Sequence, residues 1–206
     1  LDLYFAGNTE PNRLYLNRGD FRFEDVTAAS GTAAADVWSS GITTLDFDND
    51  GRLDIYVSAT HDADPERRRN KLFLNRGAGA DGIPRFAEEA ATYGLADTGY
   101  TTQTVFFDYD RDGDLDLYLL HDIYILQRSS TIKNKVTDGS SPTTDKLLRN
   151  NGDGTYTDVS QEAGIRYEGF GLGIAVLDIN RDDYPDLYVS NDFITNDVLY
   201  VNNGDG

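Results

Sequence analysis

Three copies of one short segment constrain what this chain can fold into. Each copy is a nine-residue loop with acidic residues at alternate positions, and a short apolar and aromatic run follows it at once. The copies begin at Asp46, Asp108 and Asp178, so they are 62 and 70 residues apart. Self-similarity at a near-regular spacing indicates a repeat architecture in which each copy belongs to one supersecondary unit.

Each unit is predicted to contain four short strands. The first strand ends at the acidic loop (residues 40–45, 102–107 and 171–177), and the second leaves it (53–57, 115–119 and 185–189). The third strand ends in an Asn-x-Gly turn, and an aromatic strand follows at 21–26, 86–88 and 156–159. Short β-branched and aromatic runs separated by turn residues predict an all-β chain.

Four-stranded antiparallel units in series are typical of the blades of a β-propeller. The predicted blades are residues 39–100 and 101–168, flanked by partial blades at 1–38 and 169–206. The first partial blade lacks its first strand and the last lacks its fourth, so the chain covers about four blades of an incomplete propeller. Open blade edges invite pairing, which makes a homo-oligomer through these edges one expectation.

The acidic loops predict calcium sites. Carboxylates at positions 1, 3, 5 and 9 would repel one another unless a hard cation with oxygen ligands lay among them, and Ca²⁺ suits such a flexible cage. The position-7 carbonyl is expected to complete each site, giving about three ions. An EF-hand is rejected because position 12, its usual glutamate, falls inside a strand. The predicted ligand residues are Asp46, Asp48, Asp50, Arg52 and Asp54; Asp108, Asp110, Asp112, Asp114 and Asp116; and Asp178, Asn180, Asp182, Tyr184 and Asp186.

The third loop departs from the other two. Gly51 and Gly113 stand at position 6, where a tight cage needs a left-handed backbone, but Asp183 replaces them. Asn180 also replaces an acid at position 3. The third site is therefore predicted to be the weakest, and the role of all three ions is predicted to be structural.

The charge of the chain restricts its partners. The net charge is −18, and the three loops contain four, five and four acidic residues, 13 of the 36. Nucleic acid and anionic membranes are excluded as expected partners of so acidic a chain. The chain has no cysteine and no apolar run long enough to span a bilayer. Because it begins at Leu1 and stops at Gly206 within the repeat, it is expected to be an excerpt of a longer protein.

A ligand-binding face is predicted at the end of the strands away from the acidic loops. In an antiparallel meander the long irregular insertions, residues 58–70 and 121–145, fall at that end, and recognition commonly resides on such loops. Arg67, Arg68 and Arg69, with Lys133 and Lys135, put positive charge there. Both histidines are taken to mark one equivalent position on this face. The possible ligand-face residues are His61, Asp62, His121, Asp122, Asn191 and Asp192.

The chain resembles the FG-GAP/VCBS repeats of integrin-α-type propellers, most closely the cartilage-acidic-protein-like proteins with an ASPIC/UnbV-type tail. The run Gly169-Phe170-Gly171-Leu172-Gly173, the third loop and Leu199-Tyr200-Val201-Asn202-Asn203-Gly204 carry this resemblance. The resemblance implies a propeller, usually seven-bladed when complete. It also implies calcium between the first and second strands and an extracellular, periplasmic or cell-surface setting. It implies no reaction.

The resulting functional expectation is a calcium-binding module that mediates binding, adhesion or assembly through a protein or glycan ligand. One alternative is the propeller domain of a polysaccharide lyase or glycosidase, and another is a structural subunit of a surface assembly. An enzyme would need a convergent acid and base in one pocket, and no such pair can be nominated from the sequence. The sequence therefore favours a non-enzymatic role.

Overall fold

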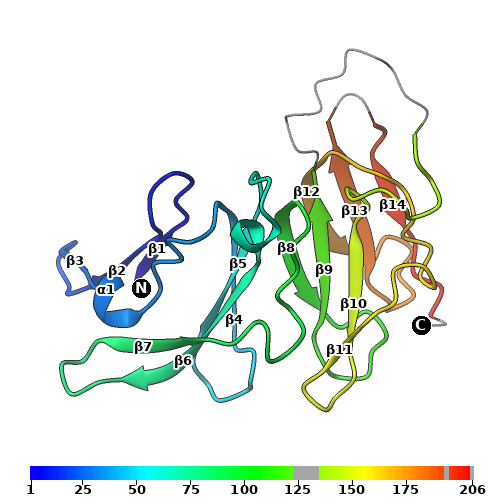
Figure 1. Ribbon diagram of the computed structural model, residues 1–206. Helices are drawn as coiled ribbons and strands as arrows, with labels where there is room; N and C mark the ends of the chain where they lie inside the picture. Colours follow the sequence, from blue (N-terminus) through cyan, green and yellow to red (C-terminus); the bar gives the residue numbers. More distant parts are fainter. Residues whose placement is uncertain (123–134, 193–194, 205–206) are drawn as a thin grey trace. The chain divides into compact units, whose positions relative to one another are not determined.

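The computed structural model describes residues 1–122, 135–192 and 195–204, and their regular secondary structure is almost entirely β-strand (Figure 1). The described part contains 14 strands in four antiparallel sheets, one four-residue α-helix and one 3-10 helix. Contacts divide the chain into two compact units, Leu1–Thr98 and Gly99–Gly206, and each unit holds two sheets. The all-β prediction is confirmed.

Unit 1 contains a three-stranded and a four-stranded sheet. The first sheet is formed by β1 (Leu3–Phe5), β2 (Arg13–Asn17) and β3 (Phe23–Asp25), and α1 (Thr27–Ser30) follows it. The second sheet is formed by β4 (Ser39–Leu45), β5 (Asp54–Ala59), β6 (Lys71–Ala78) and β7 (Pro84–Glu88). The 3-10 helix η1 (Pro65–Arg68) lies in the connection between β5 and β6.

Unit 2 repeats this arrangement in the opposite order. Its four-stranded sheet is formed by β8 (Thr101–Phe107), β9 (Asp116–His121), β10 (Lys146–Asn150) and β11 (Tyr156–Asp158). Its three-stranded sheet is formed by β12 (Gly171–Leu177), β13 (Asp186–Asn191) and β14 (Val198–Tyr200).

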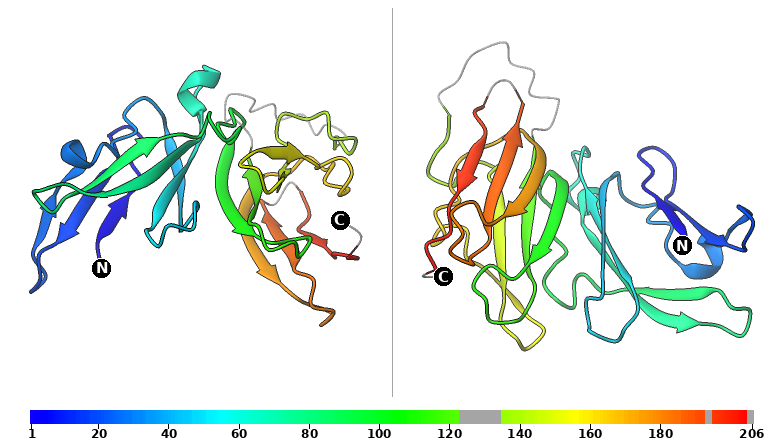
Figure 2. Two further views of the ribbon diagram at one scale, coloured as in Figure 1. Left: turned by 90° about the horizontal axis from the view of Figure 1, so that it is seen from below. Right: turned by 180° about the vertical axis from the view of Figure 1, so that it is seen from behind.

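Every sheet is a simple meander in which neighbours in sequence are neighbours in space, and both views of Figure 2 show this. The numbers of strands per sheet, three, four, four and three, agree with two full units flanked by two partial ones. Each sheet taken by itself is blade-like. The limits of individual blades and the number of blades in a complete propeller stay predictions.

The strand that precedes each acidic loop carries the same irregularity. The pairing of β4 with β5 shifts between Ser39 and Gly41, and β8 shifts likewise against β9 and β12 against β13. A bulge of this kind adds local twist to the strand that carries it. The three units are thus equivalent in register as well as in strand order.

The core of each unit lies between its two sheets. In unit 2, Tyr118 and Leu120 of β9 pack with Leu187 and Val189 of β13. In unit 1, Val57 and Phe73 form a cluster against which Tyr4 packs from the first sheet. All six residues of β5 and of β9 are buried, because each strand is central in its sheet and is covered on both faces. The first two acidic loops therefore lead directly into fully buried strands.

Candidate metal centres in the acidic loops

The three acidic loops share one backbone conformation. They connect β4 to β5, β8 to β9 and β12 to β13. Position 6 has a left-handed backbone in each loop, as predicted, with φ of 83° at Gly51, 96° at Gly113 and 71° at Asp183. Position 4 is left-handed as well, which the sequence did not reveal: φ is 56° at Asn49 and 64° at both Arg111 and Arg181.

The position-1 aspartate holds the turn of each loop. In the first loop Asp46 accepts the backbone N–H groups of Asp50 (3.0 Å) and Gly51 (2.9 Å). The carboxylate thereby occupies the concave side of the turn and fixes the backbone of positions 5 and 6. The corresponding bonds are Asp112 N and Gly113 N to Asp108 (3.1 and 3.0 Å), and Asp182 N and Asp183 N to Asp178 (3.2 and 3.0 Å).

The position-9 aspartate joins each loop to the third strand of its sheet. Asp116 accepts the N–H of Tyr109 on one oxygen (3.0 Å) and the N–H of Asn150 on the other (2.8 Å). Burial raises the pKa of Asp116 to about 6 and also raises the pKa of Asp54. The matching bonds are Phe47 N and Asn75 N to Asp54 (2.8 and 2.7 Å), and Ile179 N and Asn202 N to Asp186 (2.8 Å each).

Two of the loops bring carboxylate oxygens together closely enough to share a cation. One oxygen from each of Asp46, Asp48 and Asp50 lies within 4.8 Å of the others. In the second loop Asp108, Asp110 and Asp116 meet the same limit. Hard oxygen donors with several negative charges are what Ca²⁺ prefers, so the side chains of both loops fit this ion.

The position-5 and position-7 residues are linked in the same way in every loop. The N–H of position 7 donates to the carboxylate of position 5 at 2.9 Å, which holds the backbone of the residue whose carbonyl is the predicted seventh-position ligand. Whether that carbonyl binds the ion stays a prediction. The pairs are Arg52 with Asp50, Asp114 with Asp112 and Tyr184 with Asp182.

In the third loop the position-3 side chain is turned toward a neighbour. The Asn180 amide donates to Asp182 at 2.7 Å and its oxygen accepts the Asp182 N–H at 3.1 Å. Among the residues that the structure describes, clusters of three acidic groups occur only in the first two loops. These contacts favour the prediction that the third site is the weakest.

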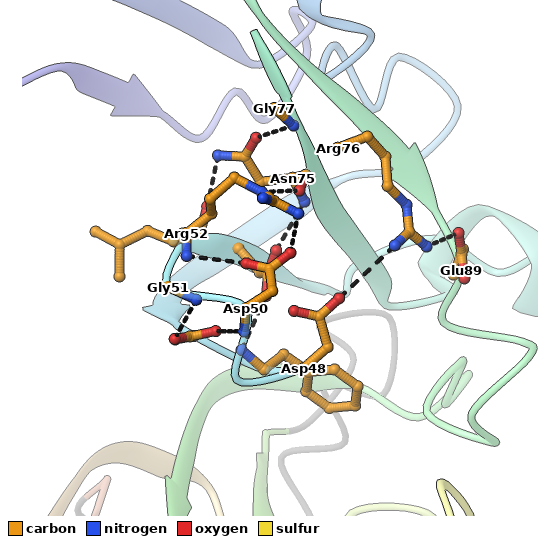
Figure 3. Close-up of polar contacts among 12 residues, drawn as sticks. Asp48, Asp50, Gly51, Arg52, Asn75, Arg76, Gly77 and Glu89 are labelled. Carbon is orange, nitrogen blue, oxygen red and sulfur yellow. Dashed lines mark hydrogen bonds and ion pairs between the residues drawn. The ribbon is translucent and has the colours of Figure 1, made fainter.

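Arginine side chains surround the first loop, and Figure 3 shows them. Arg76 lies between Asp48, at 3.7 Å, and Glu89, with which it forms an ion pair. Arg52 pairs with Asp50 and donates to the Asn75 carbonyl at 2.8 Å. The second loop has Asp114 at the position of Arg52 and Asn151 at the position of Arg76. The first loop therefore carries its own counter-charges, and the second lacks them at these positions.

The predicted equivalence of the two histidines is wrong. Strand pairing sets Ala59 opposite Ser39, His121 opposite Thr101 and Asn191 opposite Gly171. His61 lies two residues beyond this position, so the two histidines match in identity but not in register.

The predicted ligand-face residues differ in their surroundings. His61 contacts the Trp38 ring at 5.0 Å, and Asp62 pairs with Arg67 at 3.2 Å. His121 is buried at the end of β9, where its Nδ1 lies 2.7 Å from the Thr144 carbonyl.

The other three predicted ligand-face residues, Asp122, Asn191 and Asp192, make hydrogen bonds where β9 and β13 end. The amide oxygen of Asn191 accepts the N–H of Phe170 at 3.0 Å. The N–H groups of Asp122 and Asp192 donate to the carbonyls of Tyr100 and Phe170 at 3.0 and 2.9 Å. Lys133, part of the predicted basic patch, lies outside the described residues.

Comparison with known proteins decides the family. A family model for the FG-GAP-like repeat matches residues 1–57 and 122–189, more than half of the chain. The chain belongs to the FG-GAP-like repeat family. It is also 25% identical over 190 residues to human cartilage acidic protein 1, a match that covers 92% of this chain and 26% of that protein. The mouse protein of the same name is 24% identical over 189 residues, with the same two shares covered. The chain thus spans about a quarter of the length of these relatives.

The sequence analysis did not predict one role of the Asn that ends each third strand of this FG-GAP-like repeat. The Asn that ends each third strand was read only as a turn residue, but it also secures the acidic loop. Asn75 donates its N–H to Asp54 and its side-chain amide to the Leu53 carbonyl (3.2 Å), and its side-chain oxygen accepts the Gly77 N–H (3.0 Å). Asn150 and Asn202 make the same set of bonds, and Asn17 makes it with Asp2, Leu1 and Gly19. Its fourfold recurrence in the Leu-x-Leu-Asn-like motif was the signal that could have revealed this role.

A second set of polar contacts links the strands at the opposite end of each FG-GAP-like sheet. Asp145, just before β10, accepts the His121 N–H at 2.8 Å and the Tyr118 hydroxyl at 2.7 Å. Burial raises the pKa of Asp145 to about 6. Corresponding bonds run from Gly7 N to Asn12 (2.7 Å), Ala59 N to Asn70 (2.8 Å) and Asn191 N to Asp197 (2.8 Å). Each sheet is thus held at both ends by a polar side chain, which is buried or half-buried in most sheets but exposed at Asp197. The described residues include no helix of the length and hydropathy that a membrane span requires.

Proposed function

We propose that this chain is a calcium-stabilised segment of an extracellular or cell-surface β-propeller that acts as a binding, adhesion or assembly module. The observation that carries the proposal is the convergence of carboxylate oxygens within 4.8 Å in the first two loops, on one repeated backbone. Membership of the FG-GAP-like repeat family supports the propeller and the setting.

Calcium would act on stability rather than on a reaction. The side chains that would hold it are those at positions 1, 3, 5 and 9, and when bound the ion supplies positive charge that offsets their mutual repulsion. Each loop connects two strands of one sheet, so a bound ion stabilises the hairpin formed by the first two strands of a blade. A ligand that binds the folded state alone raises stability in proportion to the logarithm of its concentration above the Kd.

The proposal assigns partner binding to the end of the sheets away from the acidic loops. At the acidic end the side chains are committed to the loop itself. The connections at the other end are longer and irregular, and rigid strands present them.

A calcium titration tests the proposal. Thermal unfolding of the full chain is followed in EGTA and at rising Ca²⁺, with Mg²⁺ as the control ion. We expect the Tm to rise with Ca²⁺ and to respond much less to Mg²⁺, which requires a smaller and more rigid octahedral site. A Tm that is equal in EGTA and in saturating Ca²⁺ would contradict the proposal.

A further inference from the structure

Unit 1 contains a cavity at the end of its strands that lies away from the first acidic loop, and we propose that it binds a neutral saccharide. The cavity measures about 280 Å³ and is lined by the β1–β2 loop, the β5–β6 connection and the residues just before β4. Figure 1 shows the β1–β2 loop and η1 at this end of unit 1. The volume is slightly below the range of ~300–1,000 Å³ that is typical of drug-sized ligands, which limits the occupant to a small group such as a sugar ring.

The cavity wall includes the only tryptophan of the chain. Trp38 is half-buried, and its ring packs against His61 with centroids 5.0 Å apart and planes tilted by 37°. Its backbone N–H donates to the Arg67 carbonyl (3.3 Å) and its carbonyl accepts the Thr60 N–H (3.0 Å). An aromatic ring held this firmly is a flat apolar surface on which the C–H face of a pyranose ring can stack.

Polar side chains surround this aromatic surface. Asp62 forms an ion pair with Arg67 Nε at 3.2 Å and accepts the Asp64 N–H at 2.9 Å, so its carboxylate is held from two sides. Across the cavity, the β1–β2 loop contributes Asn8, Thr9 and Glu10. Carboxylate, guanidinium, amide and hydroxyl groups together offer both donors and acceptors, which is the set that sugar hydroxyls require.

The charges around the cavity favour a neutral ligand over an acidic one. The arginines nearest to it are engaged within the protein: Arg67 pairs with Asp62, and Arg69 pairs with Glu66. Arg68 donates to the carbonyl of Thr98 at 2.6 Å. The cavity lining itself carries two carboxylates, of Glu10 and Asp62, and one guanidinium, so an acidic saccharide would be repelled. A quaternary ammonium ligand is less well matched, because such ligands are recognised by a cage of several aromatic rings.

The inference rests on the proposed function, since it names the ligand class for the face away from the acidic loops. Trp38 makes the site directly observable, because all tryptophan fluorescence of the chain comes from this wall of the cavity. The full chain is titrated in Ca²⁺ buffer with glucose, galactose, mannose, N-acetylglucosamine, lactose and cellobiose. Glucuronic acid and tetramethylammonium serve as the acidic and cationic comparison probes.

We expect a saturable change in Trp38 emission with at least one neutral sugar. The variants Asp62→Asn and Glu10→Gln are each expected to weaken binding about tenfold, because each weakens a charge-assisted hydrogen bond to the ligand. Asp20→Asn is the matched control: it removes the same charge from the exposed β2–β3 turn and should leave the affinity unchanged. The second variant keeps the test decisive if Asp62→Asn disturbs Arg67.

Three results would overturn the inference. One is an emission that no neutral sugar changes, and another is an affinity that neither pocket variant alters. The third is a response to tetramethylammonium or glucuronic acid in place of the neutral sugars. A negative sugar titration with an intact calcium effect on Tm would sink the saccharide inference alone. Sugar binding without any calcium effect would contradict the calcium part of the proposed function instead.

Discussion

The aspartate at position 9 of each acidic loop accepts backbone hydrogen bonds and is also a predicted calcium ligand. Experiments with and without calcium can distinguish these two roles. In Asp116 both oxygens accept backbone N–H groups, one from the loop and one from β10, and the side chain is fully buried. The position-5 aspartate, Asp112, is exposed, and among the described residues the N–H group that it accepts, from Asp114, lies within its own loop. Position 9 should therefore contribute to stability with and without calcium, and position 5 mainly when the ion is bound.

Replacing Asp116 with alanine is expected to lower the free energy of unfolding by about 3 kcal/mol even in EGTA. The variant leaves the N–H groups of Tyr109 and Asn150 without their charged acceptor, and hydrogen bonds to charged groups contribute roughly 1.5–3 kcal/mol each. Urea unfolding in EGTA measures the loss. Asp112→Ala is the control, and it should lower stability mainly in Ca²⁺. Equal losses for the two variants in EGTA would contradict a stabilising role for the two hydrogen bonds that Asp116 accepts.

The arginines around the first loop are expected to weaken its affinity for calcium. Arg76 approaches Asp48 and pairs with Glu89, so its positive charge opposes a second cation at the same carboxylates. Arg76→Asn copies the residue that the second loop carries at Asn151, and it should raise the calcium affinity of the first loop severalfold. Calorimetric titration measures the change. Arg22→Asn, which removes a charge from the exposed β2–β3 turn, should have no effect, and an unchanged affinity in Arg76→Asn would contradict the assignment.

At the scale of strands and sheets, most of the fold could be predicted from the sequence because each signal occurs several times. The first strands were expected at 40–45, 102–107 and 171–177, and the structure has Ser39–Leu45, Thr101–Phe107 and Gly171–Leu177. The repeats did not reveal the left-handed backbone at position 4 of the acidic loops, because the residue types there do not indicate it. Arg111 and Arg181 adopt left-handed backbones because the position-1 carboxylate binds the following N–H groups, and neither residue type indicates such a turn.

The error on the histidines has a related cause. His61 and His121 were matched by residue type, whereas the register is set by pairing from the buried aspartates Asp54 and Asp116. Counted from those aspartates, the position of His121 is that of Ala59. Long-range hydrogen bonds such as those of Asn75 and Asp145 also lay beyond the sequence, because they join residues that only the folded meander brings together.

The buried Asp145, which accepts hydrogen bonds at the end of β9, predicts that the free energy of unfolding depends on pH. Burial raises the folded-state pKa of Asp145 from 3.8 to about 6, while the N–H of His121, the hydroxyl of Tyr118 and the charge of Lys135 act in the opposite direction. Between pH 4 and pH 6 the folded chain therefore keeps a proton that the unfolded chain releases, so this group's contribution to stability falls as the pH rises through that window. Asp145→Asn removes this dependence.

Urea unfolding of the wild type and Asp145→Asn at intervals between pH 4 and pH 7 tests this prediction. The difference between the two free energies of unfolding should change between pH 4 and pH 6 and then level off, because other carboxylates titrate equally in both proteins. A difference that stays constant over the whole range would contradict the buried, proton-binding state of Asp145.

At the scale of the whole molecule, the chain consists of two compact units that each carry at least one acidic loop with the shared backbone. The first loop lies in unit 1, and the second and third lie in unit 2. The carboxylates of all three loops are held by backbone hydrogen bonds of the same pattern. If calcium binds them, its effect should therefore extend to both units rather than to a local turn.

The most direct test of the calcium proposal combines calorimetric titration of the full chain with its thermal unfolding. Calcium well above the ~10⁻⁴–10⁻³ M affinities of extracellular modules should raise the Tm, with about one ion bound per acidic loop. A variant with Asn at Asp50, Asp112 and Asp182 should bind fewer ions and lose most of the rise. A chain that binds no calcium, and whose Tm is the same in EGTA and in excess Ca²⁺, would contradict the proposal.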